Sequence, residues 1–204
     1  DVHFPPADVD REALERGTTP AHVRLAFEEL FLFELALAMR RQAVKEEPKQ
    51  IRFNLQTPLL GRLRMLLPFG VTPAQERVIA QTQRDMASRK PMNRLVQGDV
   101  GCGKTIIALQ AMMIACGSGY QAALMVPTEI LAEQHALNVR SLVEKLGLTA
   151  VLLKAGGPPA RRNAVLRQIE TGEAQIIIGT HAVIQKGVRF ANLGLAVIDE
   201  QHKF

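Results

Sequence analysis

The nine residues QGDVGCGKT at positions 97–105 constrain the chain more than any other stretch. They fit the pattern G-x-x-x-x-G-K-[ST], whose glycines let a phosphate chain approach the backbone closely. Backbone N–H groups and the following helix N-terminus then attract the anion. A lysine adds positive charge for the outer phosphates, and a threonine hydroxyl suits Mg²⁺, which prefers oxygen ligands. We therefore expect a site for ATP and Mg²⁺, with contacts from Gly98, Gly101, Gly103, Lys104 and Thr105.

The flanks of this loop agree with the motif. Residues 94–97 read as a short strand that enters the loop, and residues 106–113 read as an apolar helix that leaves it. Strand, glycine loop and helix is the setting in which the pattern binds phosphates. A chance glycine-rich turn is the disfavoured alternative.

The first part of the chain shows helix signals and no strand pattern. Residues 1–17 read as an extended lead-in with two adjacent prolines. After them, a threonine followed by proline supplies an N-cap and a first helical residue three times. These pairs predict helices over residues 20–47, 58–67 and 73–88.

Beyond residue 91, apolar β-rich runs alternate with helical stretches. Candidate strands cover residues 94–97, 122–126, 149–153, 175–178 and 195–198. Candidate helices between them cover residues 104–116, 128–146, 158–171 and 182–185. This alternation predicts an α/β fold, with a buried parallel sheet and helices on both of its faces.

Composition limits the partners and the compartment. The 204 residues carry a net charge of +5, which permits a polyanionic partner without requiring one. The two cysteines, Cys102 and Cys116, do not suggest a disulfide framework and fit a reducing cytoplasm. The apolar run at residues 30–39 is too short to span a bilayer, so no membrane partner is expected.

A second motif follows the last candidate strand. Residues 195–198 are apolar and lead directly into Asp199-Glu200-Gln201-His202. An acidic pair at the end of a buried strand can hold Mg²⁺ through water with its first carboxylate and orient or deprotonate an attacking water with its second. Such a pair means little alone, but it is strong support for phosphoryl transfer in a chain that also carries the phosphate loop.

Taken in order, GDVGCGKT, MVPTEILAEQH, IIIGTHAVI and VIDEQH resemble the motor of superfamily 2 helicases. Within that superfamily the chain resembles the RecG family of branched-DNA translocases over essentially its whole length, including the early HFPP and LAFEELF segments. Transcription–repair coupling translocases are similar but typically carry Glu in place of Gln201. The resemblance implies a helical lead-in at residues 1–70 and a first RecA-like ATP-binding domain at 71–204.

The resemblance also implies roles for individual residues. Gln75 would read the adenine, although an exposed polar residue on a helix would look the same. His202 would link the γ-phosphate to the nucleic-acid face, next to the catalytic residues Lys104, Asp199 and Glu200. Candidate DNA contacts are Thr128, Gly156 and Thr180, for which a helix cap or a plain turn is the simpler alternative. For Arg161, Arg162 and Arg167 a solvated helix face is favoured over a DNA patch.

The chain departs from the family pattern in two respects. Cys102 occupies a position where these motors usually carry Ser or Thr, yet its backbone N–H is retained. A second RecA-like domain and a wedge domain, both expected in the full-length protein, are not in this sequence, so we expect a fragment or a truncated product that does not act as a helicase alone.

The sequence therefore favours an ATP-dependent DNA helicase that acts on branched DNA in repair and recombination. The alternative is a nucleotide-binding module without turnover. A small-molecule kinase is disfavoured by the DEQH and PTEILAEQH stretches.

Overall fold

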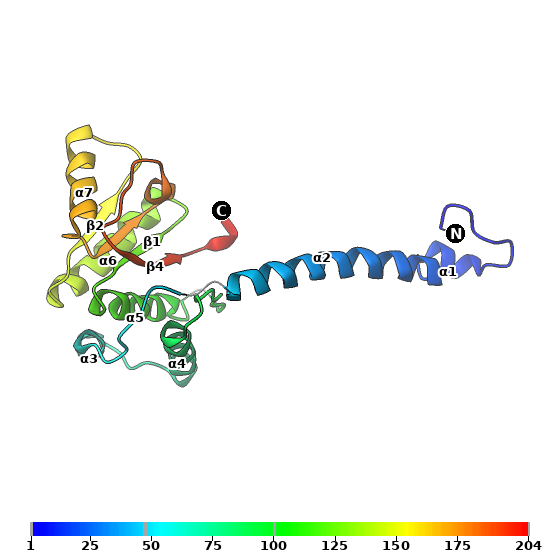
Figure 1. Ribbon diagram of the computed structural model, residues 1–204, viewed down its shortest axis with the longest axis horizontal. Helices are drawn as coiled ribbons and strands as arrows, with labels where there is room; N and C mark the ends of the chain where they lie inside the picture. The colour runs from blue at the N-terminus through cyan, green and yellow to red at the C-terminus, as the bar shows by residue number, and fades with distance from the viewer. Residues whose placement is uncertain (1, 47–48, 100, 204) are drawn as a thin grey trace. The chain divides into compact units, whose positions relative to one another are not determined.

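The computed structural model describes residues 2–46, 49–99 and 101–203 (Figure 1). By its internal contacts, the chain divides into two compact units between residues 48 and 49. The first unit holds α1 (Arg11–Glu15) and the long α2 (Pro20–Glu46). The second unit holds every strand and the remaining helices that the structure describes.

The first unit contains two helices separated by residues 16–19. The short helix α1 lies in a stretch that we expected to be extended, and the Asp10 side chain caps it by accepting a hydrogen bond from the Glu12 N–H. The predicted helix over 20–47 is present as α2, with residue 47 outside the described residues. Among the described residues, no helix is both long and apolar enough to cross a membrane.

A four-stranded parallel sheet forms the centre of the second unit. Its strands are β1 (Gln121–Met125), β2 (Ala150–Leu153), β3 (Ile176–Gly179) and β4 (Leu193–Ile198), in the order β2-β3-β1-β4. Because side chains alternate between the two faces of a strand, neighbouring residues enter different core clusters. Ile176 and Ile178 join one cluster, and Ile177 joins the other.

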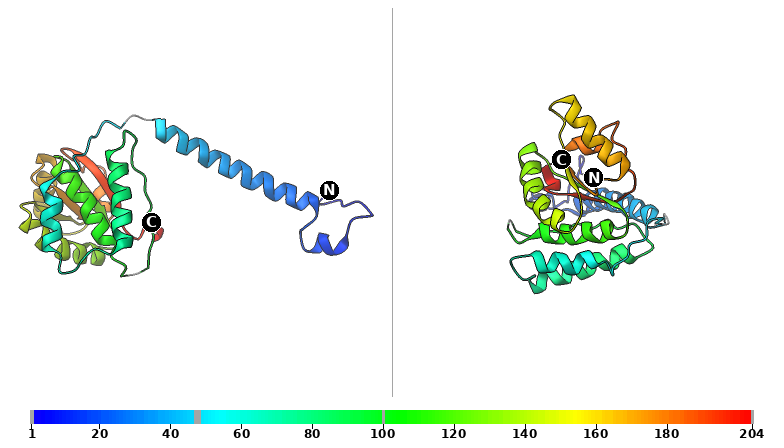
Figure 2. Two further views of the ribbon diagram at one scale, coloured as in Figure 1. Left: turned by 90° about the horizontal axis from the view of Figure 1, so that it is seen from below. Right: turned by 90° about the vertical axis from the view of Figure 1, so that its left-hand side faces the viewer.

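Helices cover both faces of this sheet, as the sequence predicts. One face packs against α5 (Lys104–Gly117) and α6 (Glu129–Lys145), and the other against α7 (Pro159–Thr171). Two further helices, α3 (Pro58–Leu66) and α4 (Pro73–Ala87), form an additional layer on α5 (Figure 2). Short 3₁₀ turns follow β3 at His181–Ile184 and β4 at Gln201–Lys203. The predicted α/β fold is therefore confirmed.

The predicted strand over residues 94–97 is wrong. These residues join no sheet, and Leu95 is 65% exposed. Arg94 instead donates to Asp85 of α4 at 2.6 Å and to Gln81 at 3.0 Å. A strand exists only through pairing with a neighbour, and the described residues offer none to this segment. The outer edge of β4 likewise carries no strand in the described part of the chain.

Residues 49–70 pack with the second unit. Leu63 of α3 is fully buried against the core cluster that contains α5. The backbone N–H of Asn54 donates to Ser118 Oγ at 2.7 Å, and the Arg62 guanidinium donates to the Lys145 carbonyl at 2.9 Å. The compact unit thus begins at residue 49, whereas the functional domain boundary at residue 70 stays a prediction.

Replacing Leu63 by alanine should lower the free energy of unfolding by about 2–5 kcal/mol, because the fully buried side chain leaves a cavity between α3 and α5. Met65, on the same helix, is 79% exposed, and Met65→Ala is the matched control. Chemical denaturation of both variants measures the difference. Equal stability of the two would show that α3 is not part of the core.

Candidate functional site

The phosphate loop has the backbone conformation that its glycines predict. Gly101 and Gly103 both have left-handed φ angles, +82° and +84°, which side chains rarely tolerate. Gly103 is the N-cap of α5, and no side chain caps this helix. Since the first turn of a helix leaves N–H groups without intrahelical partners, the start of α5 can donate to an anion. Val100 lies outside the described residues.

Lys104 folds back over this loop. Its ammonium donates to the carbonyl oxygens of Gly98 at 2.7 Å and Asp99 at 2.9 Å. Phosphate oxygens are stronger acceptors than neutral carbonyls because they are charged. The phosphates of a bound nucleotide would therefore replace the Gly98 and Asp99 carbonyls as acceptors for the Lys104 ammonium.

Gln75 fastens the start of α4 to the loop. Its side-chain oxygen accepts from the Thr72 N–H at 2.9 Å, and its amide nitrogen donates to the Cys102 carbonyl at 2.8 Å. The Thr72 hydroxyl accepts from the Gln75 N–H, which completes a capping box. Gln75 is thus more than a polar residue on an exposed helix face, while its predicted contact with adenine stays a prediction.

The acidic pair lies where β4 ends. The Asp199 N–H donates to Met125 of β1 at 2.9 Å, which continues the sheet to the acidic residue. Glu200 has a φ of +52°, which is uncommon for a residue other than glycine. Backbone conformations of this kind cluster at functional sites. Its carboxylate oxygen Oε2 lies 3.3 Å from His202 Nε2 and 3.7 Å from Lys203 Nζ.

Asp199 has a partner that sequence reasoning missed. His135 Nε2, on α6, lies 3.0 Å from Asp199 Oδ2. The sequence analysis did not single out His135, since its spacing from the cysteines suits no metal site. A signal was available, because His135 follows Thr128 by two helical turns and Thr128 lies shortly after the end of β1, the strand that pairs with β4.

The predicted Mg²⁺ ligands, Thr105 and Asp199, suit the way this ion binds in phosphate sites. Mg²⁺ keeps several waters and takes one or two protein oxygens plus phosphate oxygens. Thr105 is exposed and the Asp199 carboxylate is partly exposed, so both can reach such a hydrated ion. No cluster of three or more His, Cys, Asp or Glu side chains that could hold a metal occurs among the described residues.

The nucleotide loop and the acidic pair are not joined directly. Among the residues that the structure describes, no recorded hydrogen bond or ion pair connects residues 98–105 with Asp199 or Glu200. In the described residues, the phosphate loop and the acidic pair are therefore two separate candidate groups.

The candidate DNA contacts share one edge of the sheet. Parallel pairing sets Met125 of β1 beside Gly179 of β3, and Gly179 beside Leu153 of β2. Thr128, Thr180 and Gly156 follow these strand ends, so all three lie along the carboxyl edge, where α/β sheets collect ligands. The Thr128 hydroxyl also caps α6 by accepting from the Leu131 N–H at 3.3 Å. The Thr180 side chain makes no such cap bond.

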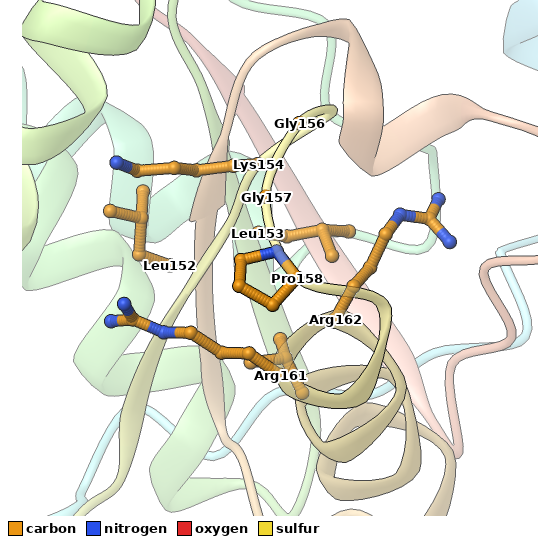
Figure 3. Close-up of a pocket in the computed structure, with 9 residues that line it drawn as sticks. Leu152, Leu153, Lys154, Gly156, Gly157, Pro158, Arg161 and Arg162 are labelled. Carbon is orange, nitrogen blue, oxygen red and sulfur yellow. The ribbon is translucent and has the colours of Figure 1, made fainter.

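A basic pocket lies beside Gly156 at the end of β2 (Figure 3). It has a cavity volume of about 170 Å³, and its lining includes Lys154, Gly157, Arg161 and Arg162. The side chains of Lys154 and Arg161 extend to one side of the loop, and that of Arg162 extends to the other. Arg161 and Arg162 therefore border a pocket, whereas the sequence favoured a solvated helix face for them. Arg167 does not line the pocket.

Comparison with known proteins gives the family. The model of the DEAD/DEAH box helicase family matches residues 72–204. The chain belongs to this family. It is 42% identical over 199 residues to the ATP-dependent DNA helicase RecG of Aquifex aeolicus, which covers 98% of this chain and 25% of that protein. The RecG of Escherichia coli O157:H7 is 44% identical, over 100% of this chain and 29% of its own length.

Solved structures agree with the sequence relatives. The structure of RecG bound to a three-way DNA junction superimposes with a TM-score of 0.79 at 35% identity, over 100% of this chain and 30% of that one. The helicase MrfA, bound to DNA and AMPPNP, is 16% identical with a TM-score of 0.57, which supports the fold alone. The predicted resemblance to RecG is confirmed, and the chain spans between a quarter and three tenths of these RecG relatives' lengths.

Gly103→Ala should weaken nucleotide binding by about tenfold or more. The left-handed conformation costs a side chain ~1–2 kcal/mol, and 1.4 kcal/mol corresponds to a factor of ten. An added Cβ would also displace the Gln75 amide nitrogen from its place beside the loop. Titration with a fluorescent ATP analogue measures the loss.

The matched control is Gly61→Ala in α3, where an added Cβ meets nothing within 4 Å. This change should leave nucleotide affinity intact. Unchanged affinity in Gly103→Ala would contradict the assignment of the loop as the phosphate site.

Proposed function

We propose that this chain is the first RecA-like motor domain, at residues 71–204, with the preceding helical segment, of a RecG-like DNA helicase. The helicase couples ATP hydrolysis to movement along branched or forked DNA in repair and recombination. The observation that carries the proposal is the phosphate loop at α5 in a chain that aligns over its whole length with RecG proteins.

In this proposal the loop binds the phosphates of ATP. Backbone N–H groups at Gly101, Gly103 and the start of α5 donate to them, and Lys104 exchanges its two carbonyl partners for phosphate oxygens. Gln75 contacts the loop and would hydrogen-bond the adenine base. Its amide oxygen and nitrogen each make one hydrogen bond and each can make a second, so adenine recognition is compatible with the contacts to Thr72 and Cys102.

The acidic pair supplies the chemistry of hydrolysis. Asp199 and Thr105 would hold Mg²⁺, which when bound neutralises charge on the transferring phosphoryl group. Glu200 orients the attacking water and accepts its proton. His202, beside Glu200, is positioned to sense the γ-phosphate. Arginines from a second RecA-like domain in the full-length protein complete the site from across a cleft, and a wedge domain engages the fork.

The carboxyl edge of the sheet binds the DNA backbone. Thr128, Thr180 and Gly156 contact phosphates there, and the basic pocket beside Gly156 extends the contact to Lys154 and Arg161. Contacts of this type fix a strand without reading its bases, so binding is independent of sequence and weakens as salt rises. The net charge of +5 agrees with a polyanionic ligand. The protein would work in the cytoplasm.

A nucleotide-binding module without turnover is the second candidate. The observation that favours it is the lack of a direct link between the phosphate loop and the acidic pair in the described residues. The two candidates differ in one measurable property, which is hydrolysis of ATP by the full-length protein.

In the full-length protein, Glu200→Gln should keep ATP affinity and lower DNA-stimulated hydrolysis at least about 100-fold, since general base catalysis contributes ~10²–10⁴. Lys104→Ala should lose both binding and hydrolysis. The exposed Glu144→Gln on α6 is the control and should behave as wild type. Steady-state hydrolysis with forked DNA and nucleotide titration separate the outcomes.

If the full-length wild-type protein binds ATP and never hydrolyses it with any DNA, the module without turnover is correct. If Glu200→Gln retains full hydrolysis in an active protein, Glu200 is not the base.

Arg161→Gln should weaken DNA binding equally for all sequences and lower the salt dependence by about one phosphate contact. Its affinity for ATP without DNA should not change. Arg167→Gln makes the same charge change on α7 away from the pocket and is the matched control. Fluorescence anisotropy over a salt series measures both variants, and identical salt slopes would remove the basic pocket from the DNA track.

A further inference from the structure

His135 and Asp199 join two elements that the proposed function treats separately. His135 lies in the second turn of α6, and Asp199 follows the last residue of β4. The distance of 3.0 Å between Nε2 and Oδ2 is that of a hydrogen bond, and the imidazole is only 15% exposed. An ionised carboxylate has no donor, so the ring N–H on Nε2 donates to Asp199.

The hydrogen bond leaves the carboxylate little freedom. Its other oxygen, Oδ1, accepts from the Glu200 N–H at 3.0 Å. The backbone of Asp199 is fixed by its bond to Met125 in the sheet. With His135 in place, both oxygens have a defined direction. Without it, the side chain of a partly exposed strand-end residue would turn about its χ1 and χ2 angles.

The donor itself is held by a firmly packed helix. Four residues of α6 are buried against the sheet: Ala132, Ala136, Val139 and Val143. The same helix begins at its cap Thr128, one of the candidate DNA contacts. A displacement of α6 at its cap would therefore move the imidazole as well.

We infer that His135 is a positioning residue for Asp199. From α6 it holds the carboxylate in the orientation that would bind the hydrated Mg²⁺. It thereby links α6, whose cap Thr128 is a candidate DNA contact, to the proposed ATP site. The inference rests on the proposed function, because Asp199 matters to catalysis only if the protein hydrolyses ATP.

Two amide variants of the full-length protein test this role. Gln and Asn carry the same N–H donor, but only the longer Gln side chain reaches the place of Nε2. We expect His135→Gln to keep most of the DNA-stimulated kcat. His135→Asn should lose about tenfold or more, the order expected for loss of a hydrogen bond to a charged group. The KM for ATP should change less than the kcat in both variants.

Mg²⁺-dependent nucleotide binding supplies a readout that does not require turnover. The Mg²⁺ concentration that half-saturates binding of a fluorescent ATP analogue should rise severalfold in His135→Asn and stay near wild type in His135→Gln. Asn138→Ala, an exposed change on the same helix, is the control for general effects on α6. Thermal unfolding of each protein reports on packing.

The inference is overturned if His135→Asn keeps wild-type kcat and Mg²⁺ dependence, or if Gln and Asn lose activity equally and in proportion to lost thermal stability. Either result would make the pair a purely structural contact. Failure of the proposed function looks different, because then the wild-type protein itself would show no DNA-stimulated hydrolysis.

Discussion

The parallel pairing of β1 with both β3 and β4 sets the positions of Thr128, Thr180 and the acidic pair at residues 199–200. Its register places Met125 beside Gly179 on one side and beside Ile198 on the other. All three strands therefore end at the same edge, and the residues that follow them, Thr128, Thr180 and Asp199, are brought together. A slip of one residue in this register would turn every core side chain to the opposite face of the sheet.

The phosphate loop depends on a second set of contacts, between helices. The Gln75 side chain links the loop to the start of α4.

The other end of α4 is held by Lys49. Its ammonium donates to the carbonyl of Met86, at the end of the helix where the dipole stabilises a cation. Burial lowers the pKa of Lys49 and raises the pKa of Cys116, within α5, to about 12. The Cys116 thiol is therefore a packing group and not a nucleophile.

Local chemistry made most of the fold predictable. A threonine followed by proline marks the starts of α3 and α4 through interactions within a few residues. The prediction of a strand at residues 94–97 was wrong because a strand needs a neighbouring strand to pair with, and the sequence of the segment does not show whether one is present. His135 was missed for a similar reason, since its partner lies 64 residues away in sequence and becomes adjacent only through the sheet. The pocket beside Arg161 likewise exists only once β2 and α7 are packed.

We propose that the carboxyl edge of the sheet carries a DNA-binding track beside an ATP site formed at α5 and β4. Amide hydrogen exchange of the full-length protein, with and without Mg-ATP and forked DNA, would locate both ligands. Mg-ATP should slow exchange at residues 101–106 and at the end of β4, and DNA should slow exchange around Thr128, Gly156 and Thr180. Protection by Mg-ATP elsewhere, with none at residues 101–106, would show that the loop is not the ATP site.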